Sequence, residues 1–142
     1  MAAVGKKPAP VGYSGKPLPE KLGLKSGVRF KLVGAPPGFG DVLAPMPDGV
    51  RRVSGGVEAD CVLLFSRAAG KLAPAFRAAA AALPAAGMLW IAWPKKSSGV
   101  ATDLTEDVVR GIGLKAGLVD VKVCAVTEVW SGLKFVRRLK DR

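Results

Sequence analysis

The sequence predicts an α/β domain with a mainly parallel sheet, and three observations carry this prediction. Two continuous apolar runs, at 59–65 and 88–93, are typical of strands that are covered on both faces. Segments with a helical pattern follow these runs, at 71–83 and 105–116. Because right-handed crossovers place such helices on both sides of a parallel sheet, we expect a single domain of three layers.

Local signals along the chain place the individual elements. Gly23 ends a helical turn that begins at Pro19, and Arg51 and Arg52 give one short strand the polar character of a sheet edge. The expected elements, in chain order, are a helical turn at 19–22, a strand at 29–33, a short helix at 41–45, strands at 50–53 and 59–65, a helix at 71–83, a strand at 88–93, a helix at 105–116, and strands at 119–126 and 133–139.

Two short motifs place the last helix and the last turn. Thr102 or Asp103 is expected to cap the helix at 105–116, because Glu106 stands three residues after Asp103, as in a capping box. Trp130 to Gly132 is expected to be a tight turn. That turn would pair the last two strands antiparallel, so that a C-terminal hairpin closes the sheet.

The basic residues are concentrated at the two ends of the chain. The net charge of +11 includes seven bases and one acid over 1–31, and five bases and one acid over 133–142. We expect a flexible basic arm at 1–12, one domain at 13–139 and a basic tail at 140–142. Basic ends attract polyanions weakly, so nucleic-acid binding through the termini is one functional alternative.

The composition excludes several classes of function. The chain has no histidine, so no histidine-dependent relay or metal site can form, and we expect neither catalytic nor metal-binding residues. Cys61 and Cys124 lie in separate apolar runs and are interpreted as reduced, buried thiols. No apolar run is long enough to cross a bilayer and the N-terminus has no apolar signal core, so we expect a cytoplasmic protein without a membrane partner.

The candidate site lies at the edge of the sheet where the parallel strands end, because ligands bind at that edge in open α/β sheets. Three glycine-containing loops follow strands and are expected to converge there. Trp90 and Trp93 are three residues apart on one strand and should face opposite sides of the sheet. The residues expected to bind a ligand are Gly34, Gly38, Gly40, Trp93, Lys95, Lys96, Ser97, Ser98, Asp103 and Trp130.

Each group of candidates also has a purely structural interpretation. The glycines of 34–40 suit either a nucleotide loop or a tight turn, and the two prolines between them remove N–H groups that a phosphate would need. The lysines and serines of 95–98 suit a phosphate or carboxylate, or a solvated loop. Asp103 can cap a helix, and Trp130 can be a packing aromatic at the sheet edge.

Several motifs resemble known families. The stretch from Lys21 to Gly34, Lys-Leu-Gly-Leu-Lys-Ser-Gly-Val-Arg-Phe-Lys-Leu-Val-Gly, resembles the lead-in to the first motif of class I S-adenosylmethionine-dependent methyltransferases. Tyr-Ser-Gly-Lys-Pro-Leu at 13–18 and Trp-Pro-Lys-Lys-Ser-Ser-Gly at 93–99 are similar to a family of small bacterial proteins of unknown function, over residues 12–138. The resemblance implies a bacterial protein with a single three-layer Rossmann-like domain.

The sequence departs from the methyltransferase pattern where that family binds its cofactor. No acidic residue lies in 30–33 before the glycine loop, and none ends the strand at 50–53 to hold ribose hydroxyls. Gly34 and Asp60 are 26 positions apart, which is too few for two further strand–helix units. The resemblance therefore implies a truncated domain that lacks the adenosine half of the pocket.

These observations favour a non-catalytic, methyltransferase-like domain that binds a small anionic ligand or a protein partner at the carboxyl ends of its strands. We expect no cofactor. An S-adenosylmethionine-dependent transferase is the enzyme alternative, and weak polyanion binding through the basic termini is the third.

Overall fold

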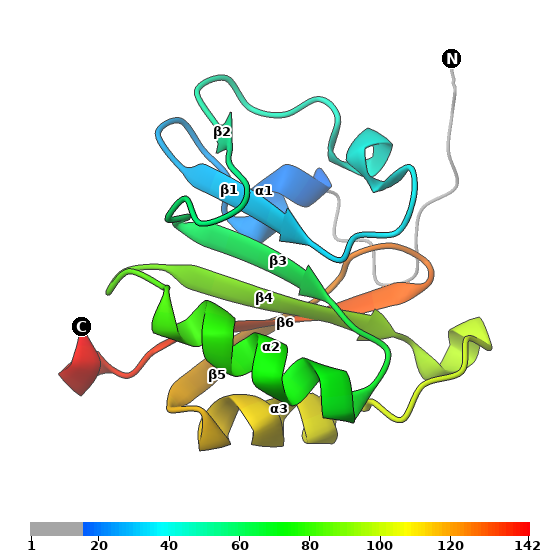
Figure 1. The fold of residues 1–142 in the computed structure, drawn as a ribbon. Helices are drawn as coiled ribbons and strands as arrows, with labels where there is room; N and C mark the ends of the chain where they lie inside the picture. Colours follow the sequence, from blue (N-terminus) through cyan, green and yellow to red (C-terminus); the bar gives the residue numbers. More distant parts are fainter. Residues whose placement is uncertain (1–15) are drawn as a thin grey trace, which may run out of the picture.

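The computed structural model describes residues 16–142, which form one mixed sheet with helices on both sides (Figure 1). The predicted basic arm at 1–12 and the first residues of the predicted domain lie outside the described residues. Within the described part of the chain, no helix is long and apolar enough to cross a membrane.

All the predicted elements except the last strand lie within two residues of their expected bounds. Two 3₁₀ turns, η2 and η3, were not expected. The elements in chain order are α1 (Leu18–Leu22), β1 (Arg29–Val33), η1 (Phe39–Leu43), β2 (Arg51–Arg52), β3 (Cys61–Phe65), α2 (Ala69–Ala81), β4 (Met88–Pro94), η2 (Lys96–Ser98), α3 (Glu106–Lys115), β5 (Leu118–Ala125), β6 (Trp130–Arg137) and η3 (Leu139–Asp141).

The sheet has the strand order β2-β1-β3-β4-β6-β5. Strands β2, β1, β3 and β4 are parallel, whereas β6 is antiparallel to both β4 and β5. The predicted parallel sheet with an antiparallel C-terminal hairpin is therefore confirmed, and β2 is an edge strand as expected. The parallel strands β1, β3 and β4 end on the right in Figure 1, and we call this side of the sheet the carboxyl edge.

Two apolar cores lie on opposite faces of the sheet. Helices α2 and α3 cover one face, which we call the helix face, while α1 and η1 lie on the opposite face (Figure 1). Strand β4 contributes to both cores, because its side chains alternate. Leu89, Ile91 and Trp93 belong to the core of the helix face, and Trp90 and Ala92 belong to the other. The expectation that the two tryptophans face opposite sides is confirmed.

The indole of Trp90 connects the centre of the sheet to α1. Its side chain is fully buried, and its Nε1 donates a hydrogen bond of 3.1 Å to the Leu22 carbonyl at the end of α1. Gly23 then ends the helix in the left-handed conformation, with φ of 87°. The hydrogen bond satisfies a buried indole N–H, so it fixes a helix of only five residues on the sheet.

The prediction of a tight turn at Trp130 to Gly132 is wrong. These residues begin β6, with Trp130 opposite Pro94 of β4, and the hairpin turn lies before them at 126–129. The Thr127 hydroxyl oxygen accepts hydrogen bonds of 3.1 Å from the backbone N–H groups of Val129 and Trp130. This threonine-based turn replaces the one expected from serine and glycine.

Helix α3 packs against β6 at Gly113. A Cβ at this buried position would overlap the ring of Phe135, whereas a Cβ at Gly111 on the exposed side of the same helix would meet nothing within 4 Å. The absent side chain at Gly113 therefore sets the distance between helix and sheet.

We expect Gly113→Ala to lower the free energy of unfolding by about 1–3 kcal/mol, because overpacking outweighs the gain in helix propensity. Gly111→Ala is the matched control and should raise the free energy of unfolding by up to about 1 kcal/mol. Urea unfolding of both variants measures the difference. Equal effects of the two substitutions would contradict the close packing.

Candidate anion site at the carboxyl edge

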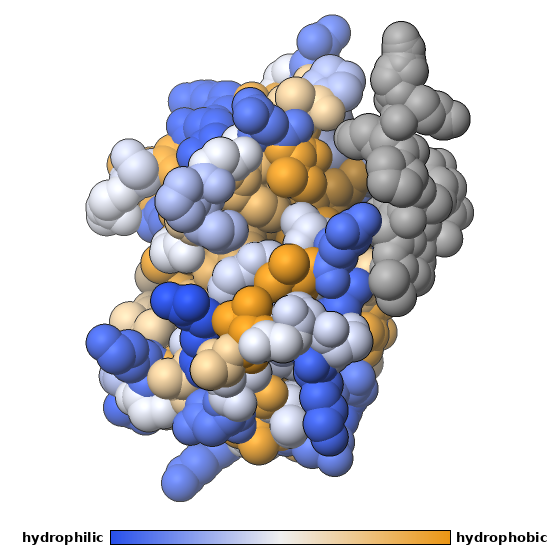
Figure 2. Space-filling model, turned by 90° about the vertical axis from the view of Figure 1, so that its right-hand side faces the viewer, coloured by the Kyte–Doolittle hydropathy of each residue, from blue (hydrophilic) through white to orange (hydrophobic). Residues whose placement is uncertain are grey.

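The carboxyl edge combines exposed apolar side chains with charged ones. Figure 2 looks onto this edge and shows apolar residues at its centre with hydrophilic residues around them. Val33 at the end of β1 and Val42 in η1 are both more than a third exposed. The predicted site residues lie at or near this edge, but the strands divide them between its two faces.

A cavity of about 570 Å³ lies on the helix face, between the end of β4 and the beginning of α3. Three of the predicted site residues line it, Trp93, Lys95 and Lys96. The other lining residues are Gly99, Val100, Ala101, Thr102, Leu104, Thr105, Glu106 and Ser131. Its walls thus combine two cations and three hydroxyls with an apolar floor that includes the buried Trp93.

Lys95 has an unsatisfied ammonium group. Its backbone N–H donates a hydrogen bond of 2.7 Å to Val129, which joins the end of β4 to the hairpin turn. Its Nζ atom is buried, and within the described residues it has no hydrogen-bond partner. Desolvation by burial lowers the pKa of Lys95, the charge of Glu128 raises it, and the charge of Lys21 lowers it further. A buried ammonium without a partner is a group that an anion would satisfy.

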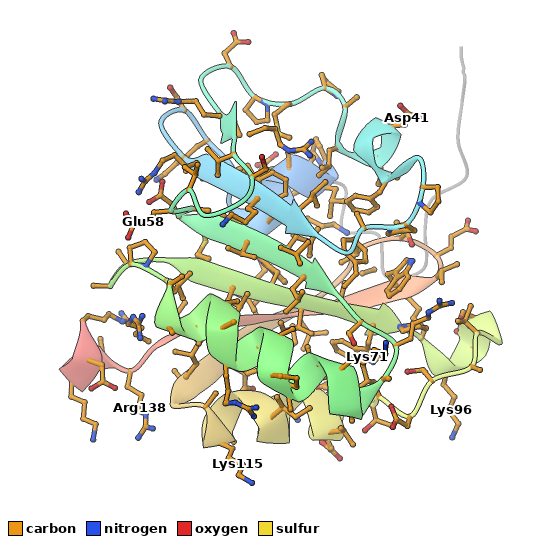
Figure 3. The ribbon with its side chains drawn as sticks, viewed as in Figure 1. Asp41, Glu58, Lys71, Lys96, Lys115 and Arg138 are labelled. Carbon is orange, nitrogen blue, oxygen red and sulfur yellow. The ribbon has the colours of Figure 1, made fainter. Side chains whose placement is uncertain are left out.

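Lys96 and the two serines belong to the η2 turn. Lys96 is exposed and extends away from the sheet (Figure 3). The Ser98 hydroxyl donates a hydrogen bond of 2.7 Å to the Lys95 carbonyl and accepts one of 3.2 Å from the Val100 N–H. Ser98 therefore holds the turn, Ser97 is exposed, and neither serine lines the cavity. Their predicted role in binding stays a prediction.

The expected cap of α3 is corrected by the structure. The side chain of Thr105 is the cap and accepts a hydrogen bond from the Val108 N–H. The Asp103 carboxylate instead accepts a hydrogen bond of 2.8 Å from the Ala69 N–H, at the start of α2. Asp103 thus supplies the capping oxygen that Ala68, the N-cap residue of α2, cannot provide. The prediction from spacing assumed that Asp103 caps the helix that follows it in the sequence, whereas Asp103 caps α2.

Two hydroxyl residues of the cavity wall were not among the predicted site residues. Thr105 was missed because the cap was assigned to Thr102 or Asp103. Ser131 was missed because it was placed in a turn, whereas it pairs with Trp93 across the β4–β6 ladder. Residues directly opposite in an antiparallel pair share a face, so the register places Ser131 beside Trp93. Only correct strand bounds would have found it.

The acidic side chains at the beginning of α3 share one cation, Arg110, with Asp120 of β5. Glu106 lines the cavity and pairs with Arg110 at 2.5 Å, and Arg110 also contacts Asp107 at 3.0 Å and Asp120 at 2.9 Å. The hydrogen bond from Arg110 holds the pKa of Asp120 below its usual value. Glu106 therefore adds less repulsion toward an anion than its formal charge implies.

The glycine loop lies on the opposite face of the sheet and is internally hydrogen-bonded. Gly34 and Gly38 have φ of 70° and 78°, and a Cβ at Gly34 would lie 3.1 Å from the Phe65 carbonyl oxygen. Phe39 and Asp41 donate their N–H groups to carbonyls within the loop. Gly34, Gly38 and Gly40 line none of the four cavities described for residues 16–142. Their role in ligand binding stays a prediction, and their geometry is that of a tight turn.

Aromatic side chains pack beside this loop. The Phe65 ring lies edge-on to Phe39 at 4.8 Å and to Trp130 at 5.0 Å between centroids. Trp130 therefore packs against the core opposite the helix face, away from the Lys95 cavity. At the carboxyl edge, the sheet separates Trp93 from the aromatic residues Phe39, Phe65 and Trp130.

The cysteines are free thiols. Burial raises the pKa of Cys61 to about 12 and also raises the pKa of Cys124. Both groups are therefore poor nucleophiles at neutral pH. Among residues 16–142, no group of three or more histidine, cysteine, aspartate or glutamate side chains could hold a metal ion.

Comparison with solved structures identifies the fold as that of class I S-adenosylmethionine-dependent methyltransferases. The chain is similar to the methyltransferase NcsB1, solved with S-adenosylmethionine and 2-hydroxy-5-methyl naphthoic acid, with a TM-score of 0.59, 12% identity and coverage of 90% of this chain and 54% of that one. The similarity to TnmH has a TM-score of 0.58 and 18% identity, and it covers 80% of this chain and 51% of TnmH. The similarity to the magnesium protoporphyrin IX methyltransferase of Synechocystis PCC 6803 has a TM-score of 0.57 and 11% identity. It covers 85% of this chain and 78% of that one.

The chain spans about half the length of TnmH and NcsB1. No model of a protein family matches the chain. No curated protein matches its sequence. At these levels of identity the comparison establishes the fold alone, and the prediction of a methyltransferase-like, Rossmann-like domain is confirmed to that extent.

The role of Asp103 can be separated from ligand binding. We expect Asp103→Ala to lower the free energy of unfolding by about 1 kcal/mol without any ligand present, because α2 loses its capping oxygen. Asp103→Asn keeps an acceptor and should retain most of the stability. Thermal or urea unfolding of the ligand-free protein measures both. A fully stable Asp103→Ala variant would show that the cap contributes nothing.

Proposed function

We propose that this chain is a methyltransferase-like domain that binds a small anionic ligand in the cavity beside Lys95 and does not itself transfer methyl groups. The observation that carries the proposal is the buried ammonium group of Lys95, which has no hydrogen-bond partner in the described residues. Burying an unpaired polar group lowers the stability of the folded protein, so such a group is a candidate for a ligand-binding role. An anion that enters the cavity would supply the missing partner.

The remaining walls favour a ligand with both polar and apolar parts. Lys96 adds a second cation, and Thr105 and Ser131 add hydroxyls that can donate to phosphate or carboxylate oxygens. A volume of about 570 Å³ is in the range of small-molecule sites. These features favour a small ligand over a protein partner, because the unsatisfied group lies inside the protein rather than on a flat surface.

Two features argue against methyl transfer. Strand β2 has only two residues, both arginines, so its end presents no carboxylate to hold ribose hydroxyls. Two N–H groups of the glycine loop, those of Phe39 and Asp41, are bonded within the loop, and the Phe39 ring packs against Phe65 beside it. A nucleotide-containing cofactor would therefore lack two of the contacts that fix it in a Rossmann-like fold.

Substitution of Lys95 by methionine should change stability and binding in opposite directions. We expect Lys95→Met to raise the free energy of unfolding of the ligand-free protein by about 1 kcal/mol, because it removes a buried unpaired charge. The same variant should lose the stabilisation that pyrophosphate gives to the unmodified protein, which is about 2.7 kcal/mol at 100 times the Kd. Thermal unfolding with and without pyrophosphate, phosphate and succinate measures both effects.

The control for charge is Lys115→Met, because Lys115 lies at the far end of α3, away from the cavity (Figure 3). This variant should keep full anion binding. Equal stabilisation of Lys95→Met and the unmodified protein by each anion would show that the site is elsewhere.

The pH dependence provides a second readout of the same group. Because the pKa of Lys95 is lowered in the folded protein, the unfolded chain binds more protons between that value and the ordinary 10.5. The stability of the ligand-free protein should therefore rise with pH over this interval, relative to Lys95→Met. Anion binding should weaken over the same interval, since it requires the protonated amine.

The second candidate function is an S-adenosylmethionine-dependent transferase. It is favoured by the solved structures of this fold, which include NcsB1 with S-adenosylmethionine and the magnesium protoporphyrin methyltransferase with S-adenosylhomocysteine. Calorimetric titration with both compounds tests it directly. Binding of S-adenosylhomocysteine that Lys95→Met does not change would favour this function over the anion site.

A further inference from the structure

A second cavity of about 460 Å³ lies beside α2 on the helix face of the sheet. Its floor is formed by β1 and β3, through Val33, Val62 and Leu64, and one wall by α2. The crossover from β2 to β3 forms the other wall, at 55–59. We call this cavity the alanine trough. It shares no lining residue with the Lys95 cavity.

The trough exists because one side of α2 carries only small side chains. Ala75, Ala78, Ala79 and Ala82 line it, at the i, i+3, i+4 and i+7 spacing of one helical face. The larger residues of the helix, Leu72 and Phe76, are fully buried in the core beneath it. Longer side chains at the four alanines would fill the space.

The trough leaves apolar surface of a parallel strand uncovered, which is unusual for such sheets. Val33 at the end of β1 is 37% exposed, and Val57 on the opposite wall is 51% exposed. An occupant with a hydrocarbon body would remove both side chains from water.

One unpaired cation lies on the wall of this apolar space. The Lys31 ammonium donates a hydrogen bond of 2.9 Å to the Gly55 carbonyl and forms no ion pair within the described residues. Glu58, the other ionisable residue of the wall, is paired with Arg29 at 3.4 Å, and Arg29 is also bonded to Asp60. Lys31 therefore retains free donors and an uncompensated positive charge for an anionic head group.

The volume identifies the size of the occupant. A single turn of α-helix with its side chains, about 5.4 Å long and 10–12 Å across, already has about this volume. A docked helix would need several turns, so the trough fits a small molecule better than a protein segment. The walls require an apolar body, and Lys31 requires a negative head group.

We propose that the alanine trough binds a medium-chain carboxylate of about eight to ten carbons, with its hydrocarbon chain along the alanine face of α2 and its carboxylate at Lys31. This site is independent of the Lys95 cavity and of the function proposed for it.

Calorimetric titration of the full chain with decanoate tests the proposal. Binding should tighten about fourfold for each added methylene from hexanoate to decanoate, as expected for burial of a hydrocarbon chain. Ala79→Leu should weaken decanoate binding at least tenfold by filling the trough. Ala81→Leu adds the same side chain at an exposed position that does not line the trough, and should leave the affinity unchanged.

The head group is tested with Lys31→Met, which should weaken decanoate several-fold and leave decanol unchanged, while Lys31→Arg should restore decanoate binding. Lys95→Met should have no effect on decanoate. Circular dichroism confirms that each variant is folded. Equal binding by the Ala79→Leu and Ala81→Leu variants, preference for decanol over decanoate, or no binding at millimolar decanoate would each overturn the proposal.

Discussion

Strand β4 lies at the centre of the sheet and contributes side chains to both cores. It pairs parallel with β3 on one side and antiparallel with β6 on the other, so it joins the parallel half of the sheet to the C-terminal hairpin. Its side chains alternate between two cores, and Trp90 and Trp93 occupy opposite ones. Contacts with β4 position helix α1 and strand β6. Helix α1 is fixed by Trp90, α3 begins beyond the end of β4, and the register with β6 brings Ser131 to Trp93.

The same alternation explains why the carboxyl edge has two different halves. On the helix face, the end of β4 and the beginning of α3 form a cavity that Lys95 lines, and the buried Nζ atom of this lysine has no hydrogen-bond partner among the described residues. On the opposite face, the glycine loop is closed by its own hydrogen bonds and by the rings of Phe39 and Phe65. The fold is similar to that of solved methyltransferases, and the half of the edge at the glycine loop is packed with aromatic rings. Binding of an anion on the remaining half is the function that this asymmetry supports best.

Much of the fold could be predicted from the sequence, because buried strands and the helices between them carry strong periodic signals. The runs at 59–65 and 88–93 located β3 and β4 to within two residues. Errors arose where a residue had two competing local roles. Ser131 and Gly132 suit a turn but extend a strand, because Thr127 forms the turn instead. Asp103 has the spacing of a cap for α3 but caps α2, since the helices lie side by side.

The mainly parallel sheet, the opposite orientation of Trp90 and Trp93, and the edge at which the loops meet could all be predicted from the sequence. These features depend on local periodicity and on the handedness of crossovers, which a chain carries along its own length. The packing of distant segments leaves the Nζ atom of Lys95 buried without a partner among residues 16–142, brings Asp103 to the start of α2, and lines a trough with four alanines. The burial of a side chain and its hydrogen-bond partners depend on which distant segments pack against it. The local sequence pattern around a residue does not contain that information.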